Sequence, residues 1–282
     1  MQRSTFVLLV SSLILAACSE AKPPVTSTVG YGQNPALPAP TSSLLPTVNI
    51  APAVGWPKDL KPIAAQGLAV NAFASGLDHP RWLSVLPNGD ILVAETNAPP
   101  KPEDSQGLRG LAMKLVMKQA GASVPSANRI SLLRDTNGDG VAETKTAFLT
   151  GLNSPFGMQL IGNTLYVANT DAIVSFPYQT GITQITATPS KLVDLPAGTI
   201  NHHWTKNIIA SRDGSKLYAT VGSNSNVAEN GMQNEVNRAA ILEVEVKTGK
   251  SRLFASGLRN PNGLAWEPQT GALWTTVNER DE

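Results

Sequence analysis

The chain has 282 residues, with 22 Lys or Arg and 21 Asp or Glu, so its formal net charge at pH 7 is +1. This balance provides no broad electrostatic attraction to nucleic acid, and we expect no nucleic-acid partner. Only 15% of the residues are charged, whereas Gly (23) and Pro (21) are frequent. Such a composition is typical of a turn-rich fold built from β-strands.

Residues 1–18 have the features of an export signal. Arg3 precedes an apolar run over 6–17 that is too short to span a bilayer as a mature helix. The run leads into Leu15-Ala-Ala-Cys18, which predicts a lipoprotein signal peptide and lipidation of Cys18. An ordinary secretory signal cut near Ala17 is the alternative. Both predict export, and the first places the protein on the periplasmic side of a bacterial membrane, attached only through its lipid.

The folded part of the chain is expected to begin well after this signal. Cys18 is the only cysteine, so no internal disulfide can form and the fold has to rest on an apolar core. Residues 19–60 are rich in Pro, Ser, Thr and Ala, which predicts a linker without a fold of its own. We therefore expect one domain over 61–282.

One pattern recurs along this domain: an apolar loop with Gly-Leu-x-x-Pro, a strand, a tight turn containing Gly and a second strand. Three copies begin at Phe73, Phe148 and Phe254, and a looser copy begins at Ile200. The last three copies are spaced at about 40 to 55 residues, the length of a propeller blade. Each copy is therefore expected to be the inner part of one blade.

Apolar runs between the copies are candidates for outer strands: Arg129–Leu133, Ala172–Phe176 and Ala240–Val246. The alternation of Leu217, Ala219 and Val221 predicts half-buried strands. The fold class is thus predicted to be all-β, a β-propeller with about four blades. A β-sandwich is the alternative, but a sandwich would not repeat the same loop before each sheet.

The first interval between copies is longer because it contains an insertion near 98–128. Apolar residues at helical spacing predict a helix there, either a lid over one face or a packing element: Leu108, Leu111, Ala112, Leu115 and Val116. At the other end, the fourth hairpin has no outer strands. Closure of a propeller normally pairs such edges, so we expect the sequence to represent an incomplete propeller.

The repeated loops carry polar residues at equivalent positions, which in a propeller gather at one end of the axis. They are Asp78-His79, Asn153-Ser154, Asn201-His202-His203 and Arg259-Asn260. An imidazole can take a proton near neutral pH, so the histidine pair is a candidate general base. Adjacent residues of an extended segment point to opposite sides, so only one of the two can face the axis. Loop Asn and Asp residues also form simple turns, and a loop histidine is often inert.

A second polar segment resembles the first half of a calcium-binding loop. Asp135, Asn137 and Asp139 alternate before Gly140, but the twelfth position is Thr146 instead of the usual Glu. The segment is predicted either to hold a structural Ca²⁺, with the Val141 carbonyl and Glu143 as further ligands, or to be a plain Asp-Gly hairpin. No phosphate-binding loop, dinucleotide fingerprint or nucleophile elbow occurs in the sequence, which disfavours nicotinamide, ATP and serine-hydrolase chemistry.

Two motifs resemble the quinoprotein glucose and sorbosone dehydrogenases, six-bladed propellers that use pyrroloquinoline quinone (PQQ) with Ca²⁺. They are 259–266 followed by the acidic run 279–282, and 201–208 followed by 217–222. The resemblance covers about 68–282 and is closest to L-sorbosone dehydrogenases. It implies an enzyme that oxidises an aldose or sorbosone-type sugar by hydride transfer to PQQ and passes the electrons to an external acceptor.

The resemblance also implies roles for single residues. His203 matches the base that removes the sugar hydroxyl proton and contacts the cofactor. Arg259 and Asn260 match cofactor contacts, and Arg259 would stabilise the charge that develops on reduction. The backbone carbonyls of Asn278, Glu279 and Arg280 match the ligands of the catalytic Ca²⁺.

Two other functions are compatible with the residues. One is a non-catalytic propeller that binds a ligand or partner at its axial face. The other is a Ca²⁺-dependent propeller hydrolase such as a lactonase, which needs several carboxylates at the axis. Glu95 and Asp171 are the obvious candidates at strand ends, so this class ranks last.

Overall fold

A computed structural model describes residues 51–57, 60–100, 107–122 and 124–279. The chain divides into two units, Met1–Ala51 and Pro52–Glu282, and all the described helices and strands belong to the second. The predicted signal peptide, Cys18 and most of the predicted linker lie outside the described residues, as does Arg280. Within the described ranges, no helix is both long and apolar enough to cross a bilayer.

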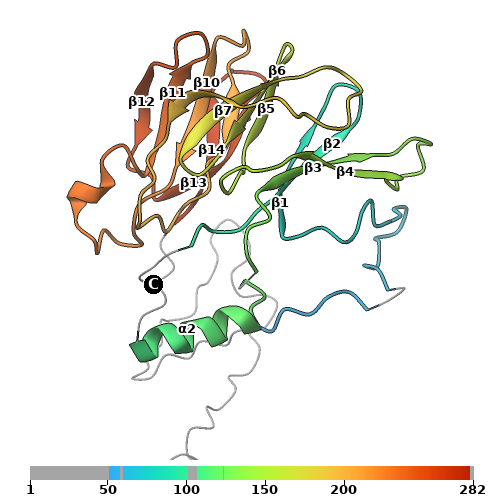
Figure 1. Cartoon of the computed structure of the whole chain (residues 1–282), viewed down its shortest axis with the longest axis horizontal. Helices are drawn as coiled ribbons and strands as arrows, with labels where there is room; N and C mark the ends of the chain where they lie inside the picture. Colours follow the sequence, from blue (N-terminus) through green and yellow to red (C-terminus); the bar gives the residue numbers. More distant parts are fainter. Residues whose placement is uncertain (1–50, 58–59, 101–106, 123, 280–282) are drawn as a thin grey trace, which may run out of the picture. The chain divides into compact units, whose positions relative to one another are not determined.

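Three antiparallel sheets of four strands follow one another along the chain (Figure 1). The first contains β1 (Pro80–Val85), β2 (Ile91–Glu95), β3 (Arg129–Arg134) and β4 (Thr144–Leu149). The second contains β5 (Met158–Ile161), β6 (Thr164–Ala168), β7 (Ala172–Pro177) and β8 (Ser190–Asp194). The third contains β9 (Ile208–Ala210), β10 (Lys216–Val221), β11 (Ala240–Glu245) and β12 (Ser251–Ser256). A fourth sheet pairs β13 (Asn260–Trp266) with β14 (Leu273–Asn278).

In each four-stranded sheet, strands adjacent in sequence are adjacent in space, which is the meander of a propeller blade. The prediction of an all-β, partial propeller with about four blades is confirmed. The three predicted outer strands are β3, β7 and β11. The repeated Gly-Leu-x-x-Pro loop also has the same local geometry in two blades. The first hairpins of blades 1 and 4 share a register irregularity after Pro80 and Pro261.

The tight turn between β1 and β2 shows why the sequence forms these hairpins. Gly89 has a φ of +88°, a conformation that a residue with a Cβ rarely adopts. The Asp90 carboxylate accepts a hydrogen bond from the Asn88 side chain at 2.8 Å and from Arg134 Nε at 2.6 Å. The turn is thereby fastened to strand β3 of the same blade.

The cores lie between the blades. Side chains alternate along strand β6, so Leu165 and Val167 join the cluster shared with blade 1, whereas Tyr166 and Ala168 join the cluster shared with blade 3. Both clusters contain side chains that are fully buried. Strand β6 therefore has no polar face, because blade 2 packs against blade 1 on one side and blade 3 on the other.

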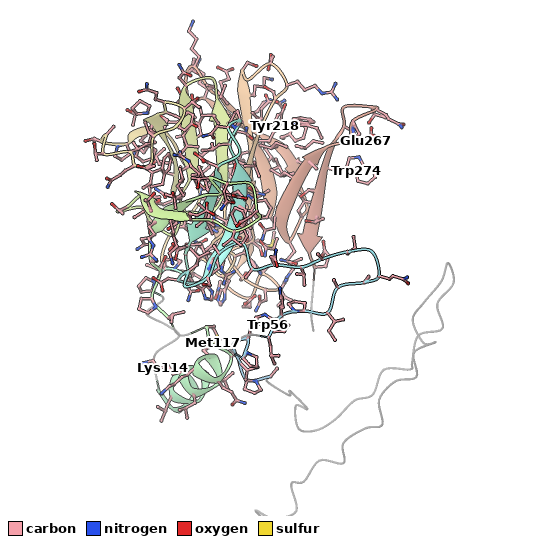
Figure 2. All side chains as sticks on the ribbon, turned by 90° about the vertical axis from the view of Figure 1, so that its right-hand side faces the viewer. Trp56, Lys114, Met117, Tyr218, Glu267 and Trp274 are labelled. Carbon is pink, nitrogen blue, oxygen red and sulfur yellow. The ribbon has the colours of Figure 1, made fainter. Side chains whose placement is uncertain are left out.

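Strand β10 departs from the sequence prediction. The alternation at 217, 219 and 221 predicted a half-buried strand, but five of its six residues are buried. On the strand face opposite Leu217, Ala219 and Val221, the ring of Tyr218 makes edge contacts with the rings of Phe254 (4.8 Å between centroids) and Trp266 (5.3 Å). Phe254 of β12 and Trp266 of blade 4 therefore cover this face, and Trp266 Nε1 donates to the Ala210 carbonyl at 2.7 Å. In contrast, Trp274 on the last strand is 65% exposed (Figure 2).

The insertion between β2 and β3 contains helix α2 (Gly107–Gln119), and a short 3₁₀ helix, η2 (Met232–Glu235), lies between β10 and β11. The backbone N–H of Ala53 donates to the Gln119 carbonyl at 2.9 Å, which links the start of the described chain to the end of α2. Leu111 and Leu115, two of the apolar residues at helical spacing, are exposed. A packing role for these two side chains is therefore not supported.

Candidate functional site

Loops before β9, after β10 and at both ends of the β13–β14 hairpin meet around His203. Residue 222 decides how closely they approach: a Cβ added to Gly222 would lie 2.3 Å from the His203 Cβ and 2.7 Å from Asn260 Oδ1. Real Cβ atoms do not approach other atoms so closely, and both contacts involve short side chains with little room to move. Gly222 therefore allows blade 4 to sit directly against the segment that carries His203.

The hydrogen bonds of His203 assign its tautomer. Nδ1 lies 2.8 Å from Ser223 Oγ and 3.1 Å from the Ser223 carbonyl, which can only accept. The Ser223 hydroxyl donates its own hydrogen to the Ser225 carbonyl at 2.7 Å, so toward His203 it also acts as an acceptor. Both contacts require a hydrogen on Nδ1. The basic nitrogen of the neutral ring is then Nε2.

Arg259 is held in one orientation by backbone and side-chain oxygens. Nε donates to the Asn226 carbonyl at 3.0 Å and Nη2 donates to Asn226 Oδ1 at 3.0 Å. Nη1 donates to the Glu279 carbonyl at 2.7 Å and to the Asn278 carbonyl at 3.4 Å. The two carbonyls expected to ligate Ca²⁺ therefore converge on a cationic group, and the third residue of that prediction lies outside the described ranges.

Asn260 completes the site. Its side chain is 8% exposed, and its buried Oδ1 has no hydrogen-bond partner among the described residues. An open cavity of about 450 Å³ is lined by residues of blades 3 and 4: His203, Asn226, Arg259, Asn260, Val277, Asn278 and Glu279. The cavity thus combines an imidazole and a guanidinium with amide side chains, a set that suits a polar ligand with anionic groups.

The polar tips of blades 1 and 2 make local contacts instead. Asp78 pairs with Arg129 (2.7 Å), and Asn153 donates to Asp171 (2.8 Å). His79 lies 3.3 Å from Arg81, and burial together with the charge of Arg81 lowers its pKa. These residues do not line the cavity that contains His203.

Glu95, the first carboxylate considered for a lactonase, is fully buried and fully bonded. Arg129 donates to both of its oxygens, at 2.9 and 2.8 Å, and further bonds come from the Ser131 hydroxyl and the Asp78 backbone N–H. Burial alone would raise the pKa of Glu95, but these hydrogen bonds hold the pKa below its usual value. Glu95 is therefore a structural carboxylate of blade 1, which weakens the case for lactonase chemistry.

The predicted calcium loop forms a compact acidic cluster. Ligand atoms of Asp135, Asp139 and Glu143 all lie within 4.8 Å of one another. The Asp135 carboxylate accepts hydrogen bonds from the backbone of Gly138 (2.7 Å) and Gly140 (2.8 Å). Asn137 donates to Glu143 at 2.9 Å instead of presenting its oxygen to the same point. The geometry is compatible with either a Ca²⁺ loop or a hydrogen-bonded hairpin.

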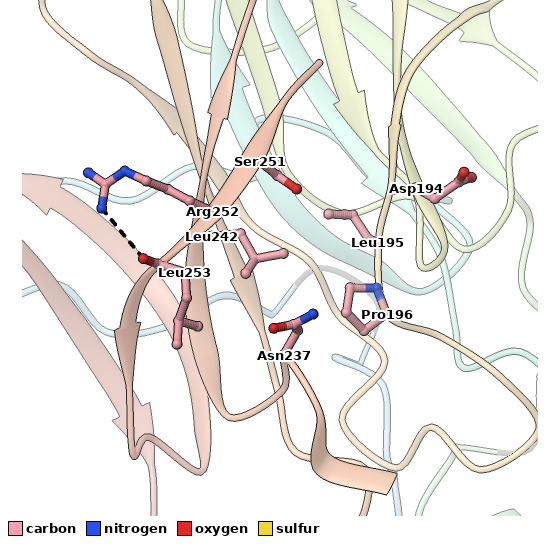
Figure 3. A pocket seen from close by; sticks show the side chains of 8 residues that line it. All are labelled: Asp194, Leu195, Pro196, Asn237, Leu242, Ser251, Arg252 and Leu253. Carbon is pink, nitrogen blue, oxygen red and sulfur yellow. Dashed lines mark hydrogen bonds between the residues drawn. The ribbon is translucent and has the colours of Figure 1, made fainter. Parts of the chain in front are cut away.

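Another cavity, of about 340 Å³, opens beside the outer strands of blades 2 and 3 (Figure 3). Arg252 is the only cation on its wall, and its guanidinium is already bonded to Glu243 by two contacts of 2.8 Å. The remaining wall has a single carboxylate, Asp194, with aliphatic and small polar side chains. This cavity therefore lacks the convergent polar groups of the one around His203.

Several residues of the main site gave no signal in the sequence. Ser223 fixes the tautomer of His203 and Asn226 holds Arg259, yet both are ordinary polar residues after a strand. The Gly222-Ser223-Asn224 run directly after strand β10 was the available clue, because a glycine at a strand end is typical of close backbone approach.

Comparison with protein families identifies the chain. The sequence profile of the family described as TrAA12-like matches residues 114–282. The chain belongs to the TrAA12-like family. The match includes blades 2, 3 and 4 and every residue of the cavity around His203. The resemblance to quinoprotein sugar dehydrogenases is thereby confirmed.

Solved structures agree on the fold. The holo PQQ domain of a pyranose dehydrogenase from Coprinopsis cinerea matches 74% of this chain and 46% of its own, with a TM-score of 0.55 and 18% identity. The Trichoderma reesei family AA12 enzyme matches 86% of this chain and 53% of its own in an iodide structure (TM-score 0.57, 18% identity). The calcium structure of the same enzyme matches 85% of this chain and 53% of its own, with a TM-score of 0.57 and 17% identity.

The TrAA12-like chain thus spans about half the length of these structures. At such identities the similarity establishes the propeller fold and not the chemistry. No curated protein sequence matches this chain.

Proposed function

We propose that this chain contributes to a sugar-oxidising quinoprotein dehydrogenase that acts on an aldose or sorbosone-type substrate. The observation that carries the proposal is the tautomer of His203. A ring that donates from Nδ1 to Ser223 presents Nε2 as its base, beside Arg259 and Asn260 in one cavity. Family membership and the fold of the pyranose dehydrogenase domain support the same activity.

In this proposal His203 Nε2 takes the proton of the sugar hydroxyl while the adjacent carbon gives up a hydride. Ser223 holds the ring in the correct tautomer and stabilises the imidazolium that forms, since its carbonyl and hydroxyl oxygen both accept from Nδ1. When bound, PQQ supplies the two-electron acceptor for that hydride. An external acceptor would be needed to take up the two electrons.

The cavity residues fit PQQ in chemical type. PQQ has carboxylates, quinone oxygens and a pyrrole N–H. Arg259 offers a guanidinium to the oxygens, and its charge is already oriented by Asn226. Asn260 lines the same cavity, and its amide is of the type that hydrogen-bonds to carboxylates and N–H groups. Arg259, Asn260 and His203 are the residues that we propose to hold the cofactor.

Calcium is proposed as the accompanying cation. The carbonyls of Asn278 and Glu279 are hard oxygen ligands of the kind that Ca²⁺ prefers, and both point toward one cationic group. Because Arg259 Nη1 donates to both carbonyls in this structure, Ca²⁺ could use these oxygens only if the guanidinium released them.

The test is dye-linked oxidation of aldoses and sorbosone by the protein loaded with PQQ and Ca²⁺. We expect His203→Gln to lower kcat by roughly 10²- to 10⁴-fold, the usual contribution of a general base. His202→Gln is the matched control, since the hydrogen bond of His202 to the Asn224 carbonyl, at 3.2 Å, uses its backbone N–H. Turnover of His203→Gln at the wild-type rate would remove His203 from the role of base.

A second candidate is a propeller that binds a ligand at this cavity without turnover. The observation in its favour is that the chain spans only about half the length of the structures it resembles, while the cavity around His203 is formed by residues of blades 3 and 4. Calorimetry separates the two: PQQ binding without sugar oxidation favours the second candidate, and binding with oxidation favours the first.

We also propose that the protein is exported and lipid-anchored through Cys18 on the periplasmic side of a bacterial membrane. The motif Leu15-Ala-Ala-Cys18 supports this proposal. Metabolic labelling with palmitate is expected to mark the wild-type protein and not Cys18→Ser. Equal labelling of the two would contradict the anchor.

A further inference from the structure

The segment that carries His203 is fastened at both ends by a buried hydrogen-bond network. At one end, Arg238 Nη1 donates to Asn201 Oδ1 at 2.9 Å, and Asn201 Nδ2 donates to Thr170 Oγ1 at 2.9 Å. At the other end, Thr170 Oγ1 donates to the Trp204 carbonyl at 2.9 Å, and Lys206 Nζ donates to the same carbonyl at 3.2 Å. Thr170 therefore connects the two ends of the segment 201–204, with the histidine pair between them.

The network contains two buried cations. Lys206 is 0% exposed and Arg238 is 6% exposed. In the described part of the chain, neither forms an ion pair with a carboxylate. Asp171 and Glu235 influence them from a distance only. A buried cation without a contacting anion is destabilising, so methionine or leucine at these positions would be the more stable choice.

The backbone beside Arg238 is also unfavourable. Asn237 and Ala239 have φ values of +57° and +50°, in the left-handed region, which asparagine tolerates but alanine rarely adopts. Arg238 lies between these two residues with its side chain buried, and its Nη2 also donates to the Ala197 carbonyl. Local strain and buried charge are thus concentrated on one arginine that contacts the segment carrying His203. Such combinations are typical of functional sites.

We infer that Arg238, Thr170 and Lys206 are positioning residues that hold His203 in its Nδ1–H orientation against Ser223. The inference rests on the proposed function for its catalytic meaning, but the orientation itself can be measured without turnover. None of the three residues lines the cavity around His203, so each acts through the backbone of 201–204. Burial, and then the charge of Arg238, lower the pKa of Lys206 to about 7, with Asp171 opposing, in keeping with its dry surroundings.

The inference is testable by nitrogen NMR of the histidine rings, because the chain has only three histidines. His202→Gln and His203→Gln assign the signals. In the wild type, we expect one sharp Nδ1–H tautomer for His203. Thr170→Val removes the hydroxyl with little change in shape, and we expect the His203 signal to split or lose the hydrogen-bonded Nδ1–H. Thr170→Ser, which keeps the hydroxyl, is expected to restore the wild-type signal.

Arg238→Leu provides an independent test from the other end of the segment, with Arg238→Lys as the conservative variant. Circular dichroism and urea unfolding establish that each variant is folded before its spectrum is compared. His203 signals of folded Thr170→Val and Arg238→Leu that superimpose on the wild type would overturn the inference. If both arginine variants fail to fold, the Thr170 pair decides alone.

Kinetics connect the orientation to the proposed reaction. For Thr170→Val we expect kcat to fall by roughly 10- to 100-fold, because misplacement of a base by about 1 Å has effects of that size, with KM nearly unchanged. If the wild type with PQQ and Ca²⁺ shows no turnover, the proposed function fails while the NMR result stands. If turnover is normal and Thr170→Val alters neither the His203 signal nor kcat, the positioning role fails alone.

Discussion

The buried polar groups of blade 1 and blade 3 differ in charge balance. In blade 1, the buried Glu95 carboxylate is matched by Arg129 and supported by a hydroxyl and a backbone N–H. In blade 3, Lys206 and Arg238 are buried against carbonyl and amide oxygens. The balanced network holds strands β2 and β3 together, whereas the unbalanced one holds a loop with the candidate base. The difference indicates that blade 1 is built for stability and that the His203 loop is built for orientation at some expense of stability.

The largest expected effect is on the balanced network. Glu95→Ala leaves Arg129 without its buried partner, so we expect the free energy of unfolding to fall by about 3–5 kcal/mol. Urea unfolding at neutral pH measures this change. Asp78→Asn is the control, because Asp78 pairs with the same arginine but its side chain is 69% exposed, and it should change stability by no more than about 1 kcal/mol.

The contribution of Glu95 to the free energy of unfolding also depends on pH. The pKa of Glu95 is lowered in the folded protein, so its contribution is present above the unfolded-state pKa and is lost as pH falls through the folded value. The stability difference between wild type and Glu95→Ala should therefore shrink in acid. A difference below 1 kcal/mol at neutral pH would contradict the view of Glu95 as a structural carboxylate.

Removing a charge from the network of Lys206 and Arg238 is expected to stabilise the protein, whereas removing Glu95 destabilises it. The pKa of Lys206 falls from 10.5 to about 7 on folding, so between these values the unfolded chain binds more protons and stability rises with pH. Lys206→Met removes the penalty of a buried ammonium. We expect this variant to be more stable than the wild type near pH 6.5, by on the order of 2–4 kcal/mol, with the gain fading toward pH 10.

Urea unfolding at pH 6.5 and 9.5 measures the Lys206 effect. Lys191→Met is the surface control, since Lys191 is 59% exposed in an i,i+3 pair and should change stability by less than about 0.5 kcal/mol at either pH. A Lys206→Met variant that is less stable than the wild type at pH 6.5 would mean that the ammonium is stabilising. The contrast drawn between the two blades would then be wrong.

A smaller effect on stability is expected at Gly222, where the loop that carries His203 meets the loop that carries Asn260. Gly222→Ala places a methyl group against His203 and Asn260, and overpacking of this kind costs about 1–3 kcal/mol. Because the displaced groups line the cavity, we also expect weaker ligand binding by calorimetry. Gly55→Ala is the control, since its Cβ would meet no atom within 4 Å. Unchanged binding and stability in Gly222→Ala would show that the loops have room to adjust.

The sequence predicted the blades well because each blade repeats the same local code. A Gly-Leu-x-x-Pro loop, an alternating strand and a turn with glycine are local features, and they gave the hairpins and three outer strands. They also brought His203, Arg259 and Asn260 to one cavity, because equivalent loops of a propeller lie at the same end. Their chemical roles stay predictions.

What the sequence did not predict depends on contacts between distant segments. The alternation along β10 predicted that one face of the strand is exposed to solvent, but Trp266 and Phe254, from later segments, cover that face. Arg238 resembles any surface arginine in the sequence, because its burial depends on contacts with Asn201 and Ala197, which are distant in the chain. The apolar spacing of α2 likewise predicted a helix but not the exposure of Leu111 and Leu115.

The smallest expected effect concerns the acidic loop of 135–143, which lies outside both networks. If it binds Ca²⁺, the three clustered carboxylates lose their mutual repulsion, and saturation at about ten times the dissociation constant stabilises the fold by about 1.4 kcal/mol. Thermal unfolding with Ca²⁺ or a chelator measures the shift, and Asp139→Asn should abolish it. The cavity around His203 is also a proposed Ca²⁺ site, with the backbone carbonyls of Asn278 and Glu279 as its ligands. Side-chain variants at these two positions leave the carbonyls in place, so they are the control and should keep the wild-type Ca²⁺ shift. A Ca²⁺ shift that survives in Asp139→Asn would assign the ion to the cavity, and no shift in the wild type would leave the loop as a hydrogen-bonded hairpin.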